Sequence, residues 1–180
     1  MHEDIENVLI AEQVIEKRLD VIARKIEEDF ADEETLQVVA ILKGALVFMA
    51  DLLRRVPLKL EIECLSVASY HGGTESSGKV DFLDQKLPEV EGRCVLLLDD
   101  ILDTGRTLAA VSERLRTMGA RKVKTCVLLT KDKERAAEVE ADYSAFEIED
   151  EFVVGYGLDF DGKYRNLPYV GVLKPEAIGS

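Results

Sequence analysis

The chain has 180 residues, of which 47% are hydrophobic and 33% are charged, a composition typical of a folded globular protein. Its 36 acidic residues outnumber the 23 basic ones and give a net charge of −13, which argues against general nucleic-acid binding because that function needs a basic surface. The acidic residues 1–4 carry no apolar segment, so we expect no signal peptide, and the apolar run 44–50 is too short to span a membrane. We therefore expect a single domain over residues 1–180 that acts in the cytoplasm.

The first half of the chain alternates between helical and strand-like patterns. Apolar residues at helical spacing over residues 11–30 predict a helix with one buried face. The nearly continuous apolar run Leu36–Leu42 is typical of a strand buried on both faces, as in a parallel sheet. After it, Lys43 and Gly44 precede a helical stretch to about residue 53, and the alternation over residues 58–64 predicts a half-buried strand.

The second half repeats this alternation. Residues 69–79 are rich in glycine, serine and threonine and predict a long loop. A second buried strand is expected over 95–98, followed by a helix over about 106–118 and a strand over 123–129. A charged helical patch and a short strand at 152–154 complete the order. This order predicts an α/β fold with a mostly parallel central sheet flanked by helices on both faces.

Three cysteines, Cys64, Cys94 and Cys126, each fall inside an apolar, strand-like stretch. They are odd in number and lack the spacing of metal ligands, so we interpret them as small buried hydrophobic residues of a protein in a reducing compartment.

The segment that follows the strand over 95–98 carries the strongest functional signal. Asp99 and Asp100 end a buried strand, where charge is costly without a partner, and they predict contacts with ribose hydroxyls or a hydrated Mg²⁺. Asp103 and residues 104–107 then open a helix whose backbone N–H groups, hydroxyls and guanidinium suit a phosphate. The ordinary alternative is that these polar residues only cap the helix.

Residues 95–108 resemble the phosphoribosyl-pyrophosphate-binding signature of the type I phosphoribosyltransferases. Further segments resemble the hypoxanthine-guanine branch in the order in which that branch has them: 42–44, Ser69-Tyr70, 128–131, 150–159 and 164–169. The resemblance implies the type I phosphoribosyltransferase fold, with a small hood formed by the terminal segments. It also implies purine salvage: Mg²⁺-dependent transfer of the phosphoribosyl group from phosphoribosyl pyrophosphate to hypoxanthine or guanine. The sequence departs from the family pattern at two positions. Asp99 stands where relatives often carry glutamate, and Arg106 stands where others have lysine or asparagine. Neither change removes this chemistry.

The resemblance also implies a role for individual residues. Asp103 matches the aspartate that manages the proton at N7 of the purine. Phosphoribosyl pyrophosphate is expected to contact residues from several motifs, namely Lys43, Gly44, Asp99, Asp100, Thr104, Gly105, Arg106, Thr107 and Arg165. Metal contacts are expected from Asp99, Asp100 and Asp159.

On the base side, the resemblance makes Lys131 the donor to the exocyclic O6 of the purine, Phe152 the ring that stacks on the base, and Val153 the source of a backbone carbonyl. Ser69 and Tyr70 match the dipeptide that begins a mobile catalytic loop. From pattern alone each position has a simpler interpretation: a solvated lysine for Lys131, a core residue for Phe152, and ordinary turn, strand-end or surface salt-bridge residues for the remaining predicted ligands.

Other functions remain open at this point. A related phosphoribosyltransferase for xanthine, uracil or adenine shares the phosphate motif, although a donor-only lysine and a stacking ring favour 6-oxopurines. A non-catalytic ligand-sensing regulator on the same fold is the alternative from another class, and a phospho-acceptor signalling domain also places acids at strand ends. We expect no nucleic-acid or membrane partner, and the resemblance implies a homodimer or homotetramer.

Overall fold

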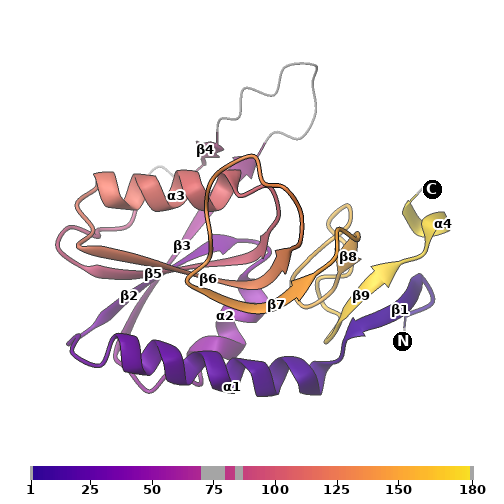
Figure 1. Ribbon diagram of the computed structural model, residues 1–180, viewed down its shortest axis with the longest axis horizontal. Helices are drawn as coiled ribbons and strands as arrows, with labels where there is room; N and C mark the ends of the chain where they lie inside the picture. Colours follow the sequence, from indigo (N-terminus) through magenta and orange to yellow (C-terminus); the bar gives the residue numbers. More distant parts are fainter. Residues whose placement is uncertain (1, 70–79, 84–86, 179–180) are drawn as a thin grey trace.

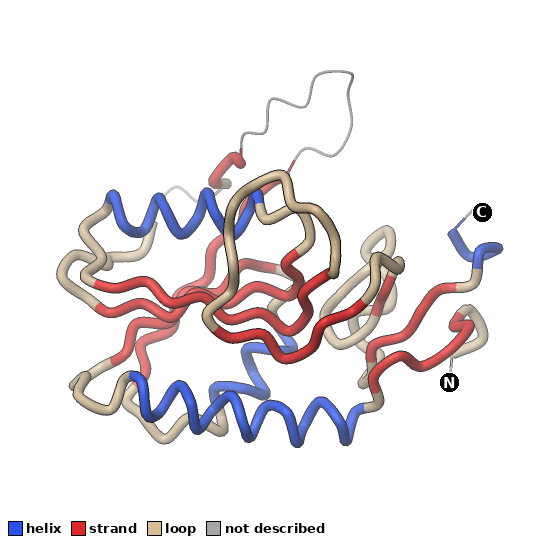
Figure 2. Tube along the Cα trace, in the orientation of Figure 1, coloured by secondary structure: helices blue, strands red, loops and turns tan. Residues whose placement is uncertain are grey.

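The computed structural model describes residues 2–69, 80–83 and 87–178 and shows a twisted sheet with helices on both faces (Figures 1 and 2). The α/β architecture expected from the sequence is confirmed. In chain order the elements are β1 (Ile5–Ile10), α1 (Glu12–Asp29), β2 (Leu36–Leu42), α2 (Leu46–Leu53), β3 (Leu60–Ser69), β4 (Val80–Phe82), β5 (Cys94–Leu102), α3 (Arg106–Thr117), β6 (Lys122–Lys131), β7 (Tyr143–Ile148), β8 (Val153–Val154), β9 (Val170–Leu173) and α4 (Pro175–Ile178).

The central sheet has the strand order β4-β3-β2-β5-β6-β7, in which β3, β2, β5, β6 and β7 are parallel and β4 is antiparallel. The chain first adds β3 on one side of β2 and later adds β5, β6 and β7 on the other side. The direction of winding therefore switches between β2 and β5. In open parallel sheets such a switch opens a crevice at the carboxyl ends of the strands, which is where ligands bind.

Two apolar cores flank this sheet. Helices α1 and α2 cover one face, and α3 covers the other (Figure 1). Helix α1 buries one stripe at helical spacing, Ile15, Leu19, Ile22 and Ile26, which is the face predicted from the sequence. Strands β2 and β5 are buried on both faces, which explains their nearly continuous apolar runs.

A second, smaller sheet lies beside the first and carries both ends of the chain (Figure 1). It has the order β1-β9-β8, with both pairs antiparallel. Ile5, Val154 and Leu173 form its core, and the Tyr164 hydroxyl donates a hydrogen bond to Asp4 at 2.9 Å. This unit is the hood that the resemblance implies, and the terminal segments form it together with β8.

Two sequence-based expectations about local structure are wrong. Residues 132–142 form neither helix nor strand, because their backbone N–H groups bond to neighbouring loops: Ala136 and Ala137 donate to the Thr104 carbonyl, and Asp132 donates to the Ile148 carbonyl. Cys64 is exposed, whereas Cys94 and Cys126 are buried as expected. Among the described residues, β4 pairs with β3 only over Val67–Ser69, beyond Cys64.

The loop predicted over residues 69–79 begins at the end of β3, and residues 70–79 lie outside the described part of the chain. Within the described residues, no helix combines the length and the apolar character that crossing a bilayer requires.

Candidate active site

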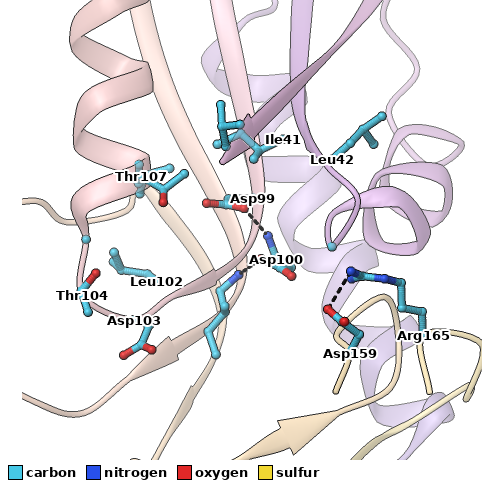
Figure 3. A pocket seen from close by; sticks show the side chains of 15 residues that line it. Ile41, Leu42, Asp99, Asp100, Leu102, Asp103, Thr104, Thr107, Asp159 and Arg165 are labelled. Carbon is cyan, nitrogen blue, oxygen red and sulfur yellow. Dashed lines mark hydrogen bonds and ion pairs between the residues drawn. The ribbon is translucent and has the colours of Figure 1, made fainter. Parts of the chain in front are cut away.

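A cavity of about 310 Å³ opens at the carboxyl ends of β2 and β5, at the switch in winding (Figure 3). Its wall includes most of the polar residues that the sequence singled out, and Leu42 and Leu102 contribute apolar surface. The predicted ligands that line it are Gly44, Asp99, Asp100, Asp103, Thr104, Gly105, Thr107, Asp159 and Arg165.

Asp99 and Asp100 lie at the floor of this cavity, near the end of β5. Asp99 is 6% exposed, and its Oδ1 accepts a hydrogen bond from the Asp100 backbone N–H at 3.0 Å, while Asp100 Oδ1 accepts one from Ile101 N–H at 2.8 Å. Burial raises the pKa of Asp99 well above its usual value, and the neighbouring charge of Asp100 raises it further. Burial also raises the pKa of Asp100. Such a pair favours a ligand that brings positive charge or hydroxyl donors.

The loop after β2 closes one side of the cavity. The peptide bond between Leu42 and Lys43 is cis. It directly precedes Lys43 and Gly44, which the resemblance makes ligands of phosphoribosyl pyrophosphate. A Cβ atom on Gly44 would lie 1.6 Å from Asp100 Oδ2, so only glycine allows the backbone to approach this carboxylate. Lys43 is exposed, and its side chain does not line the cavity.

The opposite side is the loop between β5 and α3. Gly105 is the N-cap of α3 and has φ +78°, a left-handed conformation that glycine adopts without strain. The helix has no side-chain cap and no acidic residue in its first turn, which excludes the simple capping role for Asp103. Thr104 and Thr107 face the cavity, whereas Arg106 is exposed. The free N–H groups and the dipole of α3 therefore point at a space that suits an anion.

The hairpin after β8 supplies the third wall. Arg165 Nη2 forms an ion pair with Asp159 Oδ1 at 2.6 Å, and its Nη1 donates to the Gly157 carbonyl at 2.6 Å (Figure 3). A Cβ atom on Gly157 would lie 2.1 Å from the Gly44 carbonyl oxygen, so this hairpin packs directly on the loop after β2. Arg165 is therefore a wall of the cavity and not part of an isolated surface salt bridge.

The residues predicted to contact a base, Lys131, Phe152 and Val153, do not line this cavity. Lys131 ends β6, its side chain is only 11% exposed, and its Nζ lies 2.7 Å from Asp150 Oδ1. It is thus not a solvated surface lysine. Phe152 is 45% exposed and packs edge-on against Phe160, with ring centroids 5.5 Å apart, so it is not a core residue. Val153 is buried and pairs with Val172 of β9.

Sequence reasoning missed Lys133 and Asp150 as site residues. Lys133 Nζ forms an ion pair with Asp103 Oδ1 and also lies 3.2 Å from Asp150 Oδ1. Asp150 opens the segment 150–159 that carries the resemblance but was given no role, and no pattern marks Lys133, because charged side chains are ordinary in loops. Of the predicted loop dipeptide, Ser69 is the last residue of β3, and Tyr70 lies outside the described residues.

Residues 6–161 match the phosphoribosyl transferase domain family. The chain belongs to the phosphoribosyltransferase family. The hypoxanthine-guanine phosphoribosyltransferase of Staphylococcus epidermidis is 45% identical over 176 residues, which cover 98% of each chain. This phosphoribosyltransferase is also 46% identical over 176 residues to the bifunctional protein TilS/HprT of Listeria monocytogenes, but there 98% of the chain spans only 27% of the relative.

A solved structure supports the same assignment. The hypoxanthine phosphoribosyltransferase of Staphylococcus aureus is 42% identical and superposes with a TM-score of 0.92, covering 98% of this chain and 96% of that one. The fold of this phosphoribosyltransferase is thus the type I fold that the sequence resemblance implied, and its relatives of matching length place it in the hypoxanthine-guanine branch.

Asp99 and Asp100 are the residues of this phosphoribosyltransferase best suited to a divalent cation. Asp99 is buried and the adjacent Asp100 is half-buried, and carboxylate oxygens are the ligands that Mg²⁺ prefers. Across the described residues, no three acidic, histidine or cysteine side chains gather as a ready-made metal cage, and Asp159 is engaged by Arg165. This arrangement fits Mg²⁺, which is commonly held by one or two carboxylates together with substrate phosphates.

Proposed function

We propose that the chain transfers the 5-phosphoribosyl group of phosphoribosyl pyrophosphate to hypoxanthine or guanine in purine salvage, giving IMP or GMP and pyrophosphate. One observation carries the proposal: a single cavity joins the Asp99–Asp100 carboxylate pair to the N-terminus of α3, and Asp103, which lines this cavity, is linked to Lys131 through ion pairs of Lys133 and Asp150. In the reaction the N9–C1′ bond forms, the C1′–oxygen bond to pyrophosphate breaks, and the proton lost by the base passes to Asp103.

The 5′-phosphate is proposed to bind the loop between β5 and α3. The backbone of Thr104 and Gly105, the guanidinium of Arg106 and the hydroxyl of Thr107 surround the start of the helix. Four unsatisfied N–H groups and the helix dipole favour an anion there. Support comes from the first turn of α3, which carries no acidic residue to compete.

Ribose and pyrophosphate are proposed to occupy the remaining walls. Asp99 and Asp100 accept hydrogen bonds from the ribose hydroxyls, and the two carboxylates with Asp159 also provide the contacts for Mg²⁺. The exposed Lys43, the Gly44 backbone and Arg165 bind pyrophosphate. Bound Mg²⁺ neutralises charge on the pyrophosphate as a Lewis acid.

The base is proposed to lie between Phe152 and Lys131. The exposed ring of Phe152 offers a face for stacking, and the Lys131 ammonium donates to O6. The Val153 carbonyl contacts the base edge. Asp103 takes up the N7 proton as N9 attacks C1′, a role for which a positioned carboxylate is suited. Ser69 and Tyr70 are proposed to begin a loop that closes over these groups and keeps water from the activated ribose.

Assembly and location are also proposals. The family resemblance supports a homodimer or homotetramer in the cytoplasm, with phosphoribosyl pyrophosphate, hypoxanthine and guanine as its small-molecule partners. The net charge of −13 supports the absence of nucleic acid from this set.

A panel of bases tests the proposal. Purified protein is mixed with phosphoribosyl pyrophosphate, Mg²⁺ and one base at a time (hypoxanthine, guanine, xanthine, adenine or uracil), and nucleotide formation is followed with and without EDTA. Conversion of hypoxanthine and guanine that stops in EDTA is expected, with little conversion of adenine or uracil. If xanthine is converted best, xanthine is the substrate. If folded protein converts none of the bases, the ligand-sensing regulator is favoured.

A further inference from the structure

A line of alternating charges crosses the base side of the site. It runs from Lys131 to Asp150, then to Lys133, and ends on Asp103. Lys131 Nζ lies 2.7 Å from Asp150 Oδ1, and Lys133 Nζ lies 3.2 Å from the same oxygen and in direct ion-pair contact with Asp103 Oδ1. The two residues proposed to handle O6 and N7 of the purine are therefore connected through Lys133 and Asp150.

The contact between Lys133 and Asp103 differs from an ordinary surface ion pair. Asp103 Oδ1 is shielded from solvent although the Asp103 side chain as a whole is 37% exposed, and the Lys133 side chain is 26% exposed. The contact with Asp103, together with that of Asp150, raises the pKa of Lys133, so its ammonium remains charged at neutral pH. A cation fixed beside a shielded carboxylate oxygen interacts more strongly than a pair in bulk water does.

The backbone around Lys133 is held in place from both sides. Ala136 and Ala137 donate hydrogen bonds to the Thr104 carbonyl at 3.1 and 3.3 Å, which attaches the loop to the start of α3. On the other side, the Asp132 N–H donates to the Ile148 carbonyl at 2.8 Å. Packing adds to this attachment, because a Cβ atom on Gly105 would lie 2.6 Å from the Val139 side chain. Lys133 thus extends from an anchored loop.

We propose that Lys133 is a positioning residue of the base site: by bridging Asp103 and Asp150 it holds the Asp103 carboxylate at a fixed place relative to the Lys131 ammonium. The inference rests on the proposed function, since it assigns Asp103 and Lys131 to the two sides of one purine. Lys133 acts through Asp103 and touches neither reacting atom. Its role is to remove the rotational freedom of a short side chain that must meet one nitrogen of a flat ring.

Without Lys133, the Asp103 carboxylate loses its charged partner and gains other rotamers. The productive orientation of the carboxylate then becomes a minor population. This lowers kcat and weakens binding of the purine. Phosphoribosyl pyrophosphate binds elsewhere in the cavity, so its KM stays the same. This split between the two substrates separates a positioning role from a purely structural one.

Three variants test the proposal. Lys133→Met removes the ammonium, Lys133→Arg keeps the charge, and Lys124→Met is the matched control. Lys124 lies at the other end of β6, is 22% exposed and forms an ion pair with one carboxylate, Asp29, at 2.6 Å. Each variant is assayed for kcat and for both KM values, and its melting temperature is recorded.

The expected result for Lys133→Met is a kcat about 10- to 100-fold lower and a raised base KM, with the phosphoribosyl pyrophosphate KM within about twofold. Lys133→Arg restores most of the activity, and Lys124→Met keeps it. Unchanged kcat and base KM in Lys133→Met would overturn the proposal, and so would faster turnover, which would mean that Lys133 competes with the base for Asp103. Equal changes in both KM values together with a lower melting temperature would assign Lys133 a structural role instead.

Failure of the proposed function has a different signature, which is the absence of turnover in the parent protein. In that case a crystal structure of Lys133→Met decides the inference without catalysis. An Asp103 carboxylate that leaves its place beside the β6–β7 loop supports the positioning role, and an unmoved carboxylate overturns it.

Discussion

The proposed phosphate side of this site, around Gly44 and Gly105, and its proposed base side, around Lys131 and Asp150, are built in different ways. On the phosphate side, backbone geometry dominates: the left-handed Gly105 opens α3, and Gly44 lets the main chain approach Asp100. On the proposed base side, side chains from the end of β6, the loop after it and the segment after β7 meet through ion pairs, as Lys131 and Lys133 do with Asp150. The difference teaches that glycine substitutions should damage phosphate binding, whereas charge substitutions should damage base handling.

The largest loss of activity is expected when Asp103, the residue where the two sides meet, is substituted. Asp103→Asn should lower kcat by about 10²- to 10⁴-fold, because the amide cannot take up the N7 proton. The melting temperature should change little, since the side chain is not a helix cap. Steady-state kinetics measure the effect. Asp132→Asn, which neutralises an exposed acid in the next loop, is the control variant. An Asp103→Asn enzyme with nearly full kcat would remove Asp103 from the chemistry.

The glycine half of the comparison is tested by Gly44→Ala. The added Cβ would lie 1.6 Å from Asp100 Oδ2, so the loop after β2 must shift. We expect the KM for phosphoribosyl pyrophosphate to rise about 10-fold or more and stability to fall by about 1–3 kcal/mol, with a small effect on the base KM.

Gly92→Ala is the control for this substitution. Gly92 has φ +70°, and no atom lies within 4 Å of the position that an added Cβ would take, so alanine there strains the backbone without touching the site. Both KM values should be retained. A Gly44→Ala enzyme that binds phosphoribosyl pyrophosphate normally would contradict a backbone-built phosphate side.

Phe152→Leu should change the KM for the base and leave that for phosphoribosyl pyrophosphate, the opposite of Gly44→Ala and by a smaller factor. Loss of the ring removes stacking worth about 0.5–1.5 kcal/mol, so the base KM should rise roughly 2- to 10-fold while the phosphoribosyl pyrophosphate KM is unchanged. Because Phe152 is 45% exposed, stability should fall only slightly. Steady-state kinetics with each substrate varied in turn measure the split, and a change confined to the phosphoribosyl pyrophosphate KM would place the base elsewhere.

The smallest effect is expected on the stability of the ligand-free protein. Burial raises the folded-state pKa of Asp99 above the ordinary value of 3.8, so the stability that depends on this group is greatest below that pH and falls as the pH rises through the folded-state pKa. Asp99→Asn removes this dependence. At pH 8 we expect the variant to melt at a higher temperature than the parent protein, and at pH 5 we expect this difference to be smaller.

The same substitution should abolish the stabilisation that the parent protein gains from phosphoribosyl pyrophosphate with Mg²⁺. Differential scanning fluorimetry at pH 5 and pH 8, with and without both ligands, records the two effects together. A less stable Asp99→Asn protein that still responds to the ligands would show that the carboxylate pair is structural.

How far the sequence predicts this molecule depends on whether the relevant residues are neighbours in the chain. The run Leu36–Leu42 and the helical stripe of α1 predicted their elements because periodicity is a local property. The phosphate loop was equally accessible, since residues 99–107 are contiguous. The contact between Gly44 and Asp100 was not, because it depends on how β2 and β5 lie side by side.

Residues 132–142 illustrate the opposite case. This charged segment was expected to be helical, but hydrogen bonds to the Thr104 and Ile148 carbonyls hold it as a loop. The ion pair between Lys133 and Asp103 follows from that loop and from no sequence pattern. Lys131 and Phe152 could be assigned to the base only through the family resemblance, because pattern alone favoured surface and core positions.

The most direct test of the account is a crystal structure of the protein with IMP. We expect one nucleotide that joins the two sides: its 5′-phosphate lies on residues 104–107 at the start of α3, its ribose lies against Asp99 and Asp100, and its base stacks on Phe152 within reach of Lys131. A nucleotide bound with its phosphate away from α3, or with its base away from Phe152, would contradict it.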